Sequence, residues 1–134
     1  MMRYMLDTNI CIYAIKNKPE IVFQHLQNHD PAELCISSVT YAELIYGVEK
    51  SAAAERNRLA LTLMLANIEI MSFNNHAAAC YGLIRADLER RGSPIGPLDM
   101  IIAGHAMSLG CTLVTNNVRE FSRITDLPIE NWAD

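Results

Sequence analysis

Three features are missing from this sequence, and each absence narrows the classes of protein to which it can belong. No stretch approaches the ~20 apolar residues that a membrane-spanning helix needs. The first residues lack the charged, apolar and small-residue regions of a signal peptide. No glycine-rich loop of the kind that cradles nucleotide phosphates is present. We therefore expect a cytoplasmic protein with no membrane association and no such phosphate loop.

Cysteines are few and far apart. The chain has four, and no two of them form a CxxC pair. All stand among apolar neighbours, which is typical of reduced core residues rather than of a disulfide framework or a zinc site. They are Cys11, Cys35, Cys80 and Cys111. His25 and His29 have the spacing of two zinc ligands on a helix, but the sequence offers neither an HExxH glutamate nor a third ligand beside them.

Positive charge is also scarce. The 11 lysines and arginines are outnumbered by 15 aspartates and glutamates, which gives a formal net charge of −4. A protein that coats nucleic acid through its phosphates normally has a basic surface, so the composition argues against that class. The composition still allows a local basic patch beside an acidic centre.

What is present is an alternation of short apolar runs with helical stretches, within a length that suits one domain covering residues 1–134. The runs that predict strands cover residues 3–6, 34–36, 68–71 and 112–115, with an edge strand at 128–132. Helices are predicted at 10–16, 19–29, 39–50, 52–67, 75–91 and 98–109, with a helical turn at 118–121. This alternation predicts an α/β fold in which helices flank a central parallel sheet and ligands gather at the carboxyl ends of the strands.

Asp7 directly follows the first predicted strand, in the stretch Met5-Leu6-Asp7-Thr8-Asn9. Aspartate, threonine and asparagine all cap helices well, so one interpretation of Asp7 is a helix cap. The other is part of a site at the carboxyl end of the strand. Asn9 alone can cap the following helix, which leaves Asp7 free for the second role.

Two further carboxylates stand at unexpected places. Glu43 interrupts a predicted helix that is otherwise apolar nearly all round, where burying an unpaired carboxylate is costly. Partial exposure or a salt bridge would also account for Glu43. Asp99 lies in the first turn of a predicted helix, a position that the helix dipole by itself favours. Asp99 points away from the predicted core-facing stripe of that helix, which consists of Leu98, Ile101, Ile102, His105 and Leu109.

Polar residues also follow the fourth predicted strand. Asn117 can serve as a turn residue and Glu120 as a surface charge, but both can reach the same cleft as Asp7. Carboxylates gathered without lysine or arginine in their immediate runs form an oxygen-rich site that suits Mg²⁺ or Mn²⁺. A cation would also relieve the repulsion between them.

Four segments of the chain carry these residues in order: Met5–Asn9, Ser37–Leu44, Pro97–Ala103 and Leu113–Phe121. Together they resemble the four motifs of PIN-domain ribonucleases, most closely the VapC-type toxins of bacterial VapBC toxin–antitoxin modules. The resemblance covers essentially the whole chain. It implies that Asp7, Glu43 and Asp99 are catalytic residues and ligands of Mg²⁺ or Mn²⁺. It also implies that the hydroxyls of Thr8 and Thr115 support them.

The fourth acidic position stays open within the resemblance. Many members of the family have an aspartate where this chain has Asn117, and others have their last acid where Glu120 stands. We therefore expect Asn117, Glu120 or both to complete the catalytic set.

The activity that the resemblance implies is metal-dependent hydrolysis of RNA, in the anticodon region of initiator tRNA. The implied partners are a cognate VapB-type antitoxin, a second copy in a homodimer, and a higher hetero-oligomer that binds operator DNA only through the antitoxin. RNA contacts are expected from arginines that are otherwise ordinary solvated residues: Arg85, Arg90, Arg91 and Arg119. Two alternatives stay open, a catalytically weak PIN-type binding module and a structure-specific DNA nuclease.

Overall fold

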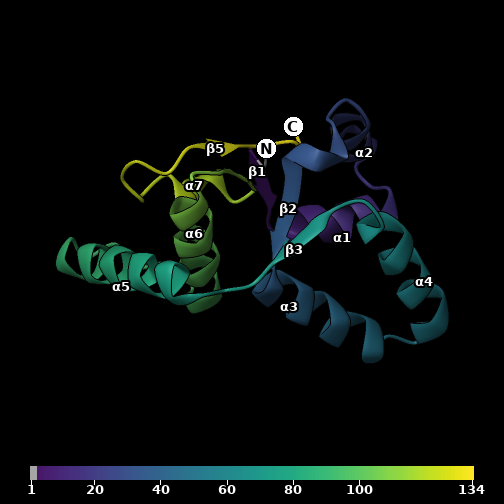
Figure 1. The fold of residues 1–134 in the computed structure, drawn as a ribbon, viewed down its shortest axis with the longest axis horizontal. Helices are drawn as coiled ribbons and strands as arrows, with labels where there is room; N and C mark the ends of the chain where they lie inside the picture. The colour runs from purple at the N-terminus through teal and green to yellow at the C-terminus, as the bar shows by residue number, and fades with distance from the viewer. Residues whose placement is uncertain (1–2) are drawn as a thin grey trace.

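A five-stranded sheet forms the centre of the computed structural model, which describes residues 3–134 (Figure 1). The strand order is β3-β2-β1-β4-β5, and every neighbouring pair is parallel. The strands are β1 (Tyr4–Leu6), β2 (Leu34–Ser37), β3 (Glu69–Met71), β4 (Thr112–Val114) and β5 (Ile129–Glu130). The predicted α/β fold with a central parallel sheet is thereby confirmed.

Seven α-helices and one 3₁₀ turn connect the strands. They are α1 (Thr8–Lys16), α2 (Glu20–Gln27), α3 (Ser38–Glu49), α4 (Ala54–Leu65), α5 (Asn75–Arg90), α6 (Pro97–Leu109) and α7 (Val118–Phe121), with the 3₁₀ turn at Pro31–Glu33. The helices fall into two groups, α1 to α4 on one half of the molecule and α5 to α7 on the other (Figure 1). Each predicted helix is present, with ends that differ by no more than two residues.

Two hydrophobic cores lie on opposite faces of the sheet, because successive strand side chains point to opposite faces. Met5 and Leu113 pack with residues of α5, α6 and α7. Leu6 and Val114, one position further along the same strands, pack with residues of α1 to α4. The strands are therefore buried on both faces, as parallel strands normally are.

The helices α5 and α6 cross closely at Gly104. A Cβ atom at this position would lie 2.7 Å from the backbone nitrogen of Tyr81 and 2.8 Å from its Cα. Because such separations are far below van der Waals contact, only glycine lets the two helices approach this closely. The crossing holds α6 on the face of the sheet that carries Met5 and Leu113. Asp99 lies in the first turn of this helix.

The core-facing stripe predicted for α6 is partly wrong. Leu98 is 45% exposed, and the buried residues of the helix include Met100, Ala103 and Ala106 as well as Ile102 and His105. The helix is enclosed on more than one side, because α5 packs against it through small residues while its other side faces the sheet. Leu98 lies at the beginning of the helix, where it faces a cavity rather than the core.

The four cysteines form no disulfide, and His25 and His29 pack against an aromatic ring. All four cysteines are free, and three of them are buried. His25 and His29 both stack on the indole ring of Trp132, with ring centroids 5.2 and 4.4 Å away. In the described part of the chain, no helix is long and apolar enough to cross a bilayer.

Candidate functional site

A cavity of about 360 Å³ opens at the carboxyl end of the sheet, as the parallel topology requires. Asp7 reaches it from the residue after β1, Glu43 from the second turn of α3 and Asp99 from the first turn of α6. The structure thus brings together the three carboxylates that were predicted to share one site. The remaining lining residues are Thr8, Asn9, Gly96, Pro97, Leu98 and Ile102.

Asp7 is both a helix cap and a lining residue of the cavity. Its Oδ1 accepts a 2.9 Å hydrogen bond from the backbone N–H of Ile10, so Asp7 is the N-cap of α1. The expectation that Asn9 caps this helix is therefore wrong, because Asn9 lies inside the first turn. The cap occupies one carboxylate oxygen, and the side chain still borders the cavity.

Asp7 as a whole residue is 5% exposed, and this burial is the main reason that the pKa of its carboxyl group is raised. Hydrogen bonds from Thr115 and from the Ile10 backbone lower the pKa and offset part of that effect. The negative charge of Glu43 raises it further. Thr115 therefore stands in the supporting position predicted for it, beside Asp7.

Glu43 is held by a hydroxyl rather than by a cation. The Oγ1 of Thr8 donates a 2.8 Å hydrogen bond to Oε1 of Glu43. The same hydroxyl lies 3.5 Å from Oγ1 of Thr40, which is buried. The salt bridge considered for Glu43 is not among the ion pairs of residues 3–134. Glu43 is partly exposed, as one of the two alternatives for it required, and its side chain lines the cavity.

Asp99 has the most perturbed carboxyl group of the site, with its pKa raised to about 6. Burial is the largest cause, followed by a hydrogen bond shared with Glu120 and by the negative charges of Glu120, Asp7 and Glu43. The pKa of Asp99 therefore responds to the other three carboxylates, and that of Asp7 responds to Glu43. A fixed positive charge that would relieve this repulsion is not among the residues that line the cavity.

Glu120 and Asn117 lie beside the cavity as a hydrogen-bonded pair. The side-chain amide of Asn117 donates a 3.0 Å hydrogen bond to Oε2 of Glu120. The backbone N–H of Asn117 donates to Oγ1 of Thr115 at 2.9 Å. Through these bonds Asn117 orients Glu120, and Glu120 in turn contacts Asp99. The structure thus places both candidates for the fourth acidic position beside Asp99, with Glu120 in contact with it.

The arrangement suits a hydrated hard cation. Within residues 3–134, no three Asp, Glu, His or Cys side chains are close enough together to hold a metal ion directly. Mg²⁺, however, usually keeps several waters and binds proteins through one or two carboxylates. Asp7, Glu43 and Asp99 supply carboxylate oxygens around a cavity with room for such waters. Their mutual repulsion is what a cation would remove.

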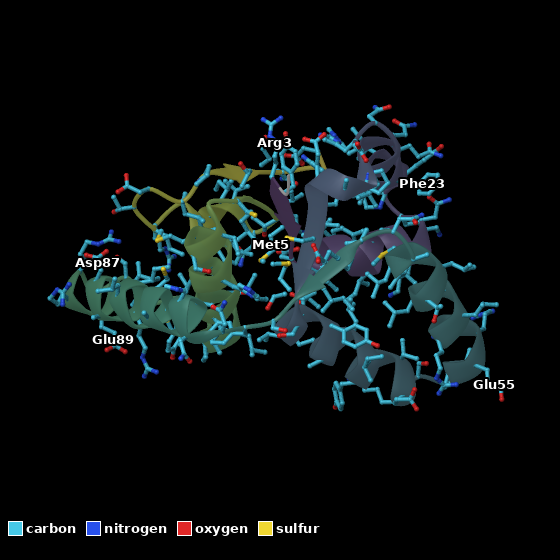
Figure 2. All side chains as sticks on the ribbon, in the orientation of Figure 1. Arg3, Met5, Phe23, Glu55, Asp87 and Glu89 are labelled. Carbon is cyan, nitrogen blue, oxygen red and sulfur yellow. The ribbon has the colours of Figure 1, made fainter. Side chains whose placement is uncertain are left out.

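The predicted RNA-binding arginines are not part of this cavity. Arg85 pairs with Glu89 at 3.0 Å, and Arg91 pairs with Asp87 at 2.8 Å. Figure 2 shows Asp87 and Glu89 on the outer part of α5, the helix that extends furthest from the sheet in this view. In contrast, Arg90 and Arg119 are exposed and take part in none of the ion pairs of the described residues.

Several lining residues were not anticipated from the sequence. Gly96 precedes α6 directly, and a Cβ atom there would lie 3.3 Å from Oδ2 of Asp99. Pro97 and Leu98 form the adjacent rim, and Ile102 lies one turn further along the helix. Residues 92–97, which include two glycines and two prolines, carried the signal for this rim, because Pro97 at the first helical position fixes where the helix begins.

Known proteins resemble this chain over nearly its whole length. Residues 4–127 match the PIN domain. The chain is 49% identical over 133 residues to the tRNA(fMet)-specific endonuclease VapC of Salmonella typhimurium, which covers 99% of this chain and 100% of that protein. It is 44% identical over 135 residues to Ribonuclease VapC2 of Rickettsia felis, with 98% of each chain covered.

Solved structures agree with the sequence relatives. The crystal structure of DNA-bound VapBC from Salmonella typhimurium superposes with a TM-score of 0.92 at 48% identity, covering 98% of this chain and 99% of that chain. VapBC2 from Rickettsia felis, bound to a DNA fragment from its promoter, gives a TM-score of 0.91 at 43% identity with the same coverage. This chain therefore belongs to the PIN-domain family, and within that family to the VapC ribonucleases.

Proposed function

We propose that this chain is the toxin of a type II toxin–antitoxin module and acts as a divalent-metal-dependent endoribonuclease. The observation that carries the proposal is the convergence of Asp7, Glu43 and Asp99 on one cavity that has no lysine or arginine in its wall. A scaffold or binding module has no need for carboxylates that raise one another's pKa. The full-length similarity to proteins named as VapC ribonucleases supports the same activity.

Asp7 and Asp99 would hold the cation, which is Mg²⁺ or Mn²⁺. Glu43 has one oxygen bonded to Thr8, and its other oxygen is available to accept a proton from a water or to join the ligands. Glu120, oriented by Asn117, keeps Asp99 in place. When bound, the cation lowers the pKa of a water and stabilises negative charge on the phosphate. Hydrolysis by water leaves a 5′-phosphate and a 3′-hydroxyl.

The proposed substrate is tRNA, and specifically the anticodon region of initiator tRNA. Support comes from the relative named as a tRNA(fMet)-specific endonuclease, with which this chain shares nearly half of its residues. Of the four predicted arginines, Arg90 and Arg119 form no ion pair in the described chain, so we expect these two to contact RNA phosphates. Arg85 and Arg91 are already engaged by carboxylates on their own helix.

The proposed partners are a cognate VapB-type antitoxin and a second copy of the toxin, in a hetero-oligomer that binds operator DNA through the antitoxin. The support is that two similar solved structures are VapBC complexes bound to DNA. The net charge of −4 makes direct DNA binding by this chain alone unfavourable.

Cleavage of purified RNA tests the proposal directly. The chain is stripped of metal with EDTA and incubated with initiator tRNA, elongator tRNAs and a DNA duplex, with and without Mg²⁺ or Mn²⁺. We expect metal-restored cutting of initiator tRNA, with 5′-phosphate ends in the anticodon loop. Asp99→Asn should abolish cutting, while Glu89→Gln, which removes a carboxylate outside the cavity, should leave it unchanged.

Three outcomes would overturn the proposal or part of it. Cutting that persists in EDTA would exclude metal dependence, and normal turnover by a folded Asp99→Asn protein would exclude the assigned site. Cutting of the DNA duplex in preference to RNA would favour a DNA nuclease. Equal degradation of all tRNAs would remove the initiator tRNA assignment while leaving the ribonuclease in place.

A further inference from the structure

A second cavity adjoins the candidate active site and has no role in the proposed chemistry. Its volume is about 310 Å³, and it lies between α1, α3 and α4. Glu43 lines both this cavity and the one that holds the carboxylates. The remaining lining residues are Ile12, Ile15, Lys16, Leu44, Gly47, Val48, Ser51 and Asn57.

The two cavities follow one another along the same pair of helices. On α1, Thr8 lines the first cavity, while Ile12 and Lys16, one and two turns later, line the second. On α3, Gly47 follows Glu43 by one turn, which is ~6 Å along the helix axis. The helices α1, α3 and α4 pack against one another on the same half of the molecule (Figure 1). An extended chain at the carboxylates can therefore continue into the second cavity.

The walls of the second cavity differ from its edge. Ile12, Ile15, Leu44 and Val48 make the walls apolar. The edge carries the ammonium group of Lys16, which is exposed and belongs to none of the ion pairs of residues 3–134. It also carries the side-chain amide of Asn57, which donates a 3.0 Å hydrogen bond to Oγ of Ser51. Ser51 is fixed in turn by a 2.6 Å bond to the carbonyl of Val48.

Gly47 keeps this cavity open. It lies in the interior of α3, where glycine destabilises a helix relative to alanine. A Cβ atom at position 47 would meet no atom within 4 Å, so packing does not require the glycine. A larger side chain would extend from the helix into the space between α3 and α1.

We propose that this second cavity is a subsite for the base of the nucleotide next to the scissile phosphate, an inference that rests on the proposed ribonuclease activity. Enzymes that act on an unstacked nucleotide hold its base in a pocket between aromatic or apolar side chains and bond the edge of the base with polar groups. Here the apolar walls contact the faces of the base, the amide of Asn57 bonds its edge, and Lys16 pairs with a neighbouring phosphate. An apolar peptide side chain would fill the walls and leave both polar groups unused.

Filling the cavity tests the inference. Gly47→Leu places an isobutyl group in the cavity and should not disturb the helix. Gly82→Leu is the matched control, because Gly82 lies in the interior of α5 and a Cβ atom there also meets nothing within 4 Å. Two quantities are measured: the Kd for a short single-stranded RNA in EDTA, by fluorescence anisotropy, and kcat/KM for its cleavage after Mg²⁺ is restored.

We expect Gly47→Leu to raise the Kd and lower kcat/KM by about tenfold, with a melting temperature equal to or above that of the wild type, while Gly82→Leu leaves the Kd and kcat/KM at wild-type level. Equal values for wild-type and Gly47→Leu would overturn the subsite. Normal RNA cleavage by Gly47→Leu together with loss of inhibition by the antitoxin would overturn it too, because the cavity would then belong to that protein. Failure of the wild-type chain to cut any RNA would instead overturn the proposed function, and the subsite with it.

Asn57→Ala tests the contact with the base through a quantity that would not change if Asn57 had only a structural role, namely the base preference beside the cut. Cleavage of a single-stranded RNA with a randomised position beside the cut shows the base preference of each protein. We expect the preference at that position to weaken in Asn57→Ala and to persist in Gly82→Leu. An unchanged preference would overturn the assigned contact, and this variant also decides the matter if Gly47→Leu does not fold.

Discussion

The hydroxyl of Thr8 donates a 2.8 Å hydrogen bond to Oε1 of Glu43, and this bond joins the first turn of α1 to the second turn of α3. Thr8 directly follows Asp7, the N-cap of α1. The neighbouring residues Asp7 and Thr8 therefore fix two carboxylates at the start of one helix: that of Asp7 itself and, through the hydroxyl of Thr8, that of Glu43. We expect Thr8→Val to reduce kcat about tenfold while changing the melting temperature little. Thr8→Ser, which keeps the hydroxyl, should retain most of the activity. Full activity of Thr8→Val would show that the orientation of Glu43 does not matter.

The two roles of Asp7 can be separated by the choice of substitution. Asparagine caps helices as well as aspartate does, so Asp7→Asn should keep the hydrogen bond to Ile10 while removing the charge. We expect it to abolish cleavage and leave the melting temperature equal or higher. Asp7→Ala loses the cap as well and should cost about 1 kcal/mol of unfolding free energy. Thermal unfolding and RNA cleavage of both proteins make the comparison, and residual cutting by Asp7→Asn would contradict the metal role.

The metal-free protein should lose stability as the pH rises from about 4 to about 6. Asp99 has an ordinary pKa of 3.8 in the unfolded chain and a pKa of about 6 in the folded one. Between these values the folded chain binds a proton that unfolding releases, so higher pH favours unfolding. Melting temperatures in EDTA across this range measure the effect. Asp99→Asn should flatten the profile, and Mg²⁺ should raise the wild-type melting temperature above pH 6. A profile that rises with pH would contradict the assignment.

We expect Gly96→Ala to fold normally but to catalyse RNA cleavage more slowly. Its backbone φ of −56° is accessible to any residue, so the substitution introduces no backbone strain. The added Cβ atom would lie 3.3 Å from Oδ2 of Asp99, which must then move by a few tenths of an ångström. We expect a several-fold loss of kcat with a normal melting temperature. Gly82→Ala, in open space on α5, is the control and should retain wild-type kcat.

Arginines without carboxylate partners should matter more for RNA binding than paired ones. Arg119→Ala and Arg90→Ala should each weaken RNA binding uniformly across sequences and reduce the slope of log Kd against log salt by about 1. Arg85→Ala should leave that slope unchanged, because its guanidinium is held by Glu89 and Tyr81. RNA affinities at several salt concentrations distinguish these cases, and equal slopes for all variants would exclude Arg90 and Arg119 as phosphate contacts.

The sequence predicted the fold well because its elements are strongly marked. Polar residues follow the ends of β1 and β4, and the helices α5 and α6 end just before Gly92 and Gly110, which adopt the positive φ typical of a helix end. The convergence of Asp7, Glu43 and Asp99 was also predictable, because in a parallel sheet all strands end at the same edge. The pairing of Arg85 with Glu89 could have been read from their spacing of four residues.

Other features depended on contacts that no local pattern encodes. A helix cap needs extended backbone geometry, and Asp7 has it because it directly follows the last residue of β1. Asn9 is already helical and cannot be the cap. Leu98 matched a helical stripe, yet the close crossing at Gly104 moves the buried surface of α6 toward smaller residues. The contact between Glu120 and Asp99 joins residues 21 positions apart, and it forms only when α7 and α6 are both packed.

The position of β1 has a consequence for the synthesis of the protein. This strand is made before the others, but it lies in the middle of the sheet and pairs with β2 and with β4, whose residues Thr112–Val114 are made only after the helices α1 to α6. A nascent chain that stops before Glu120 holds at most three of the four carboxylates. The carboxylate cavity at the end of this sheet is thus assembled only after β4 and α7 have been made.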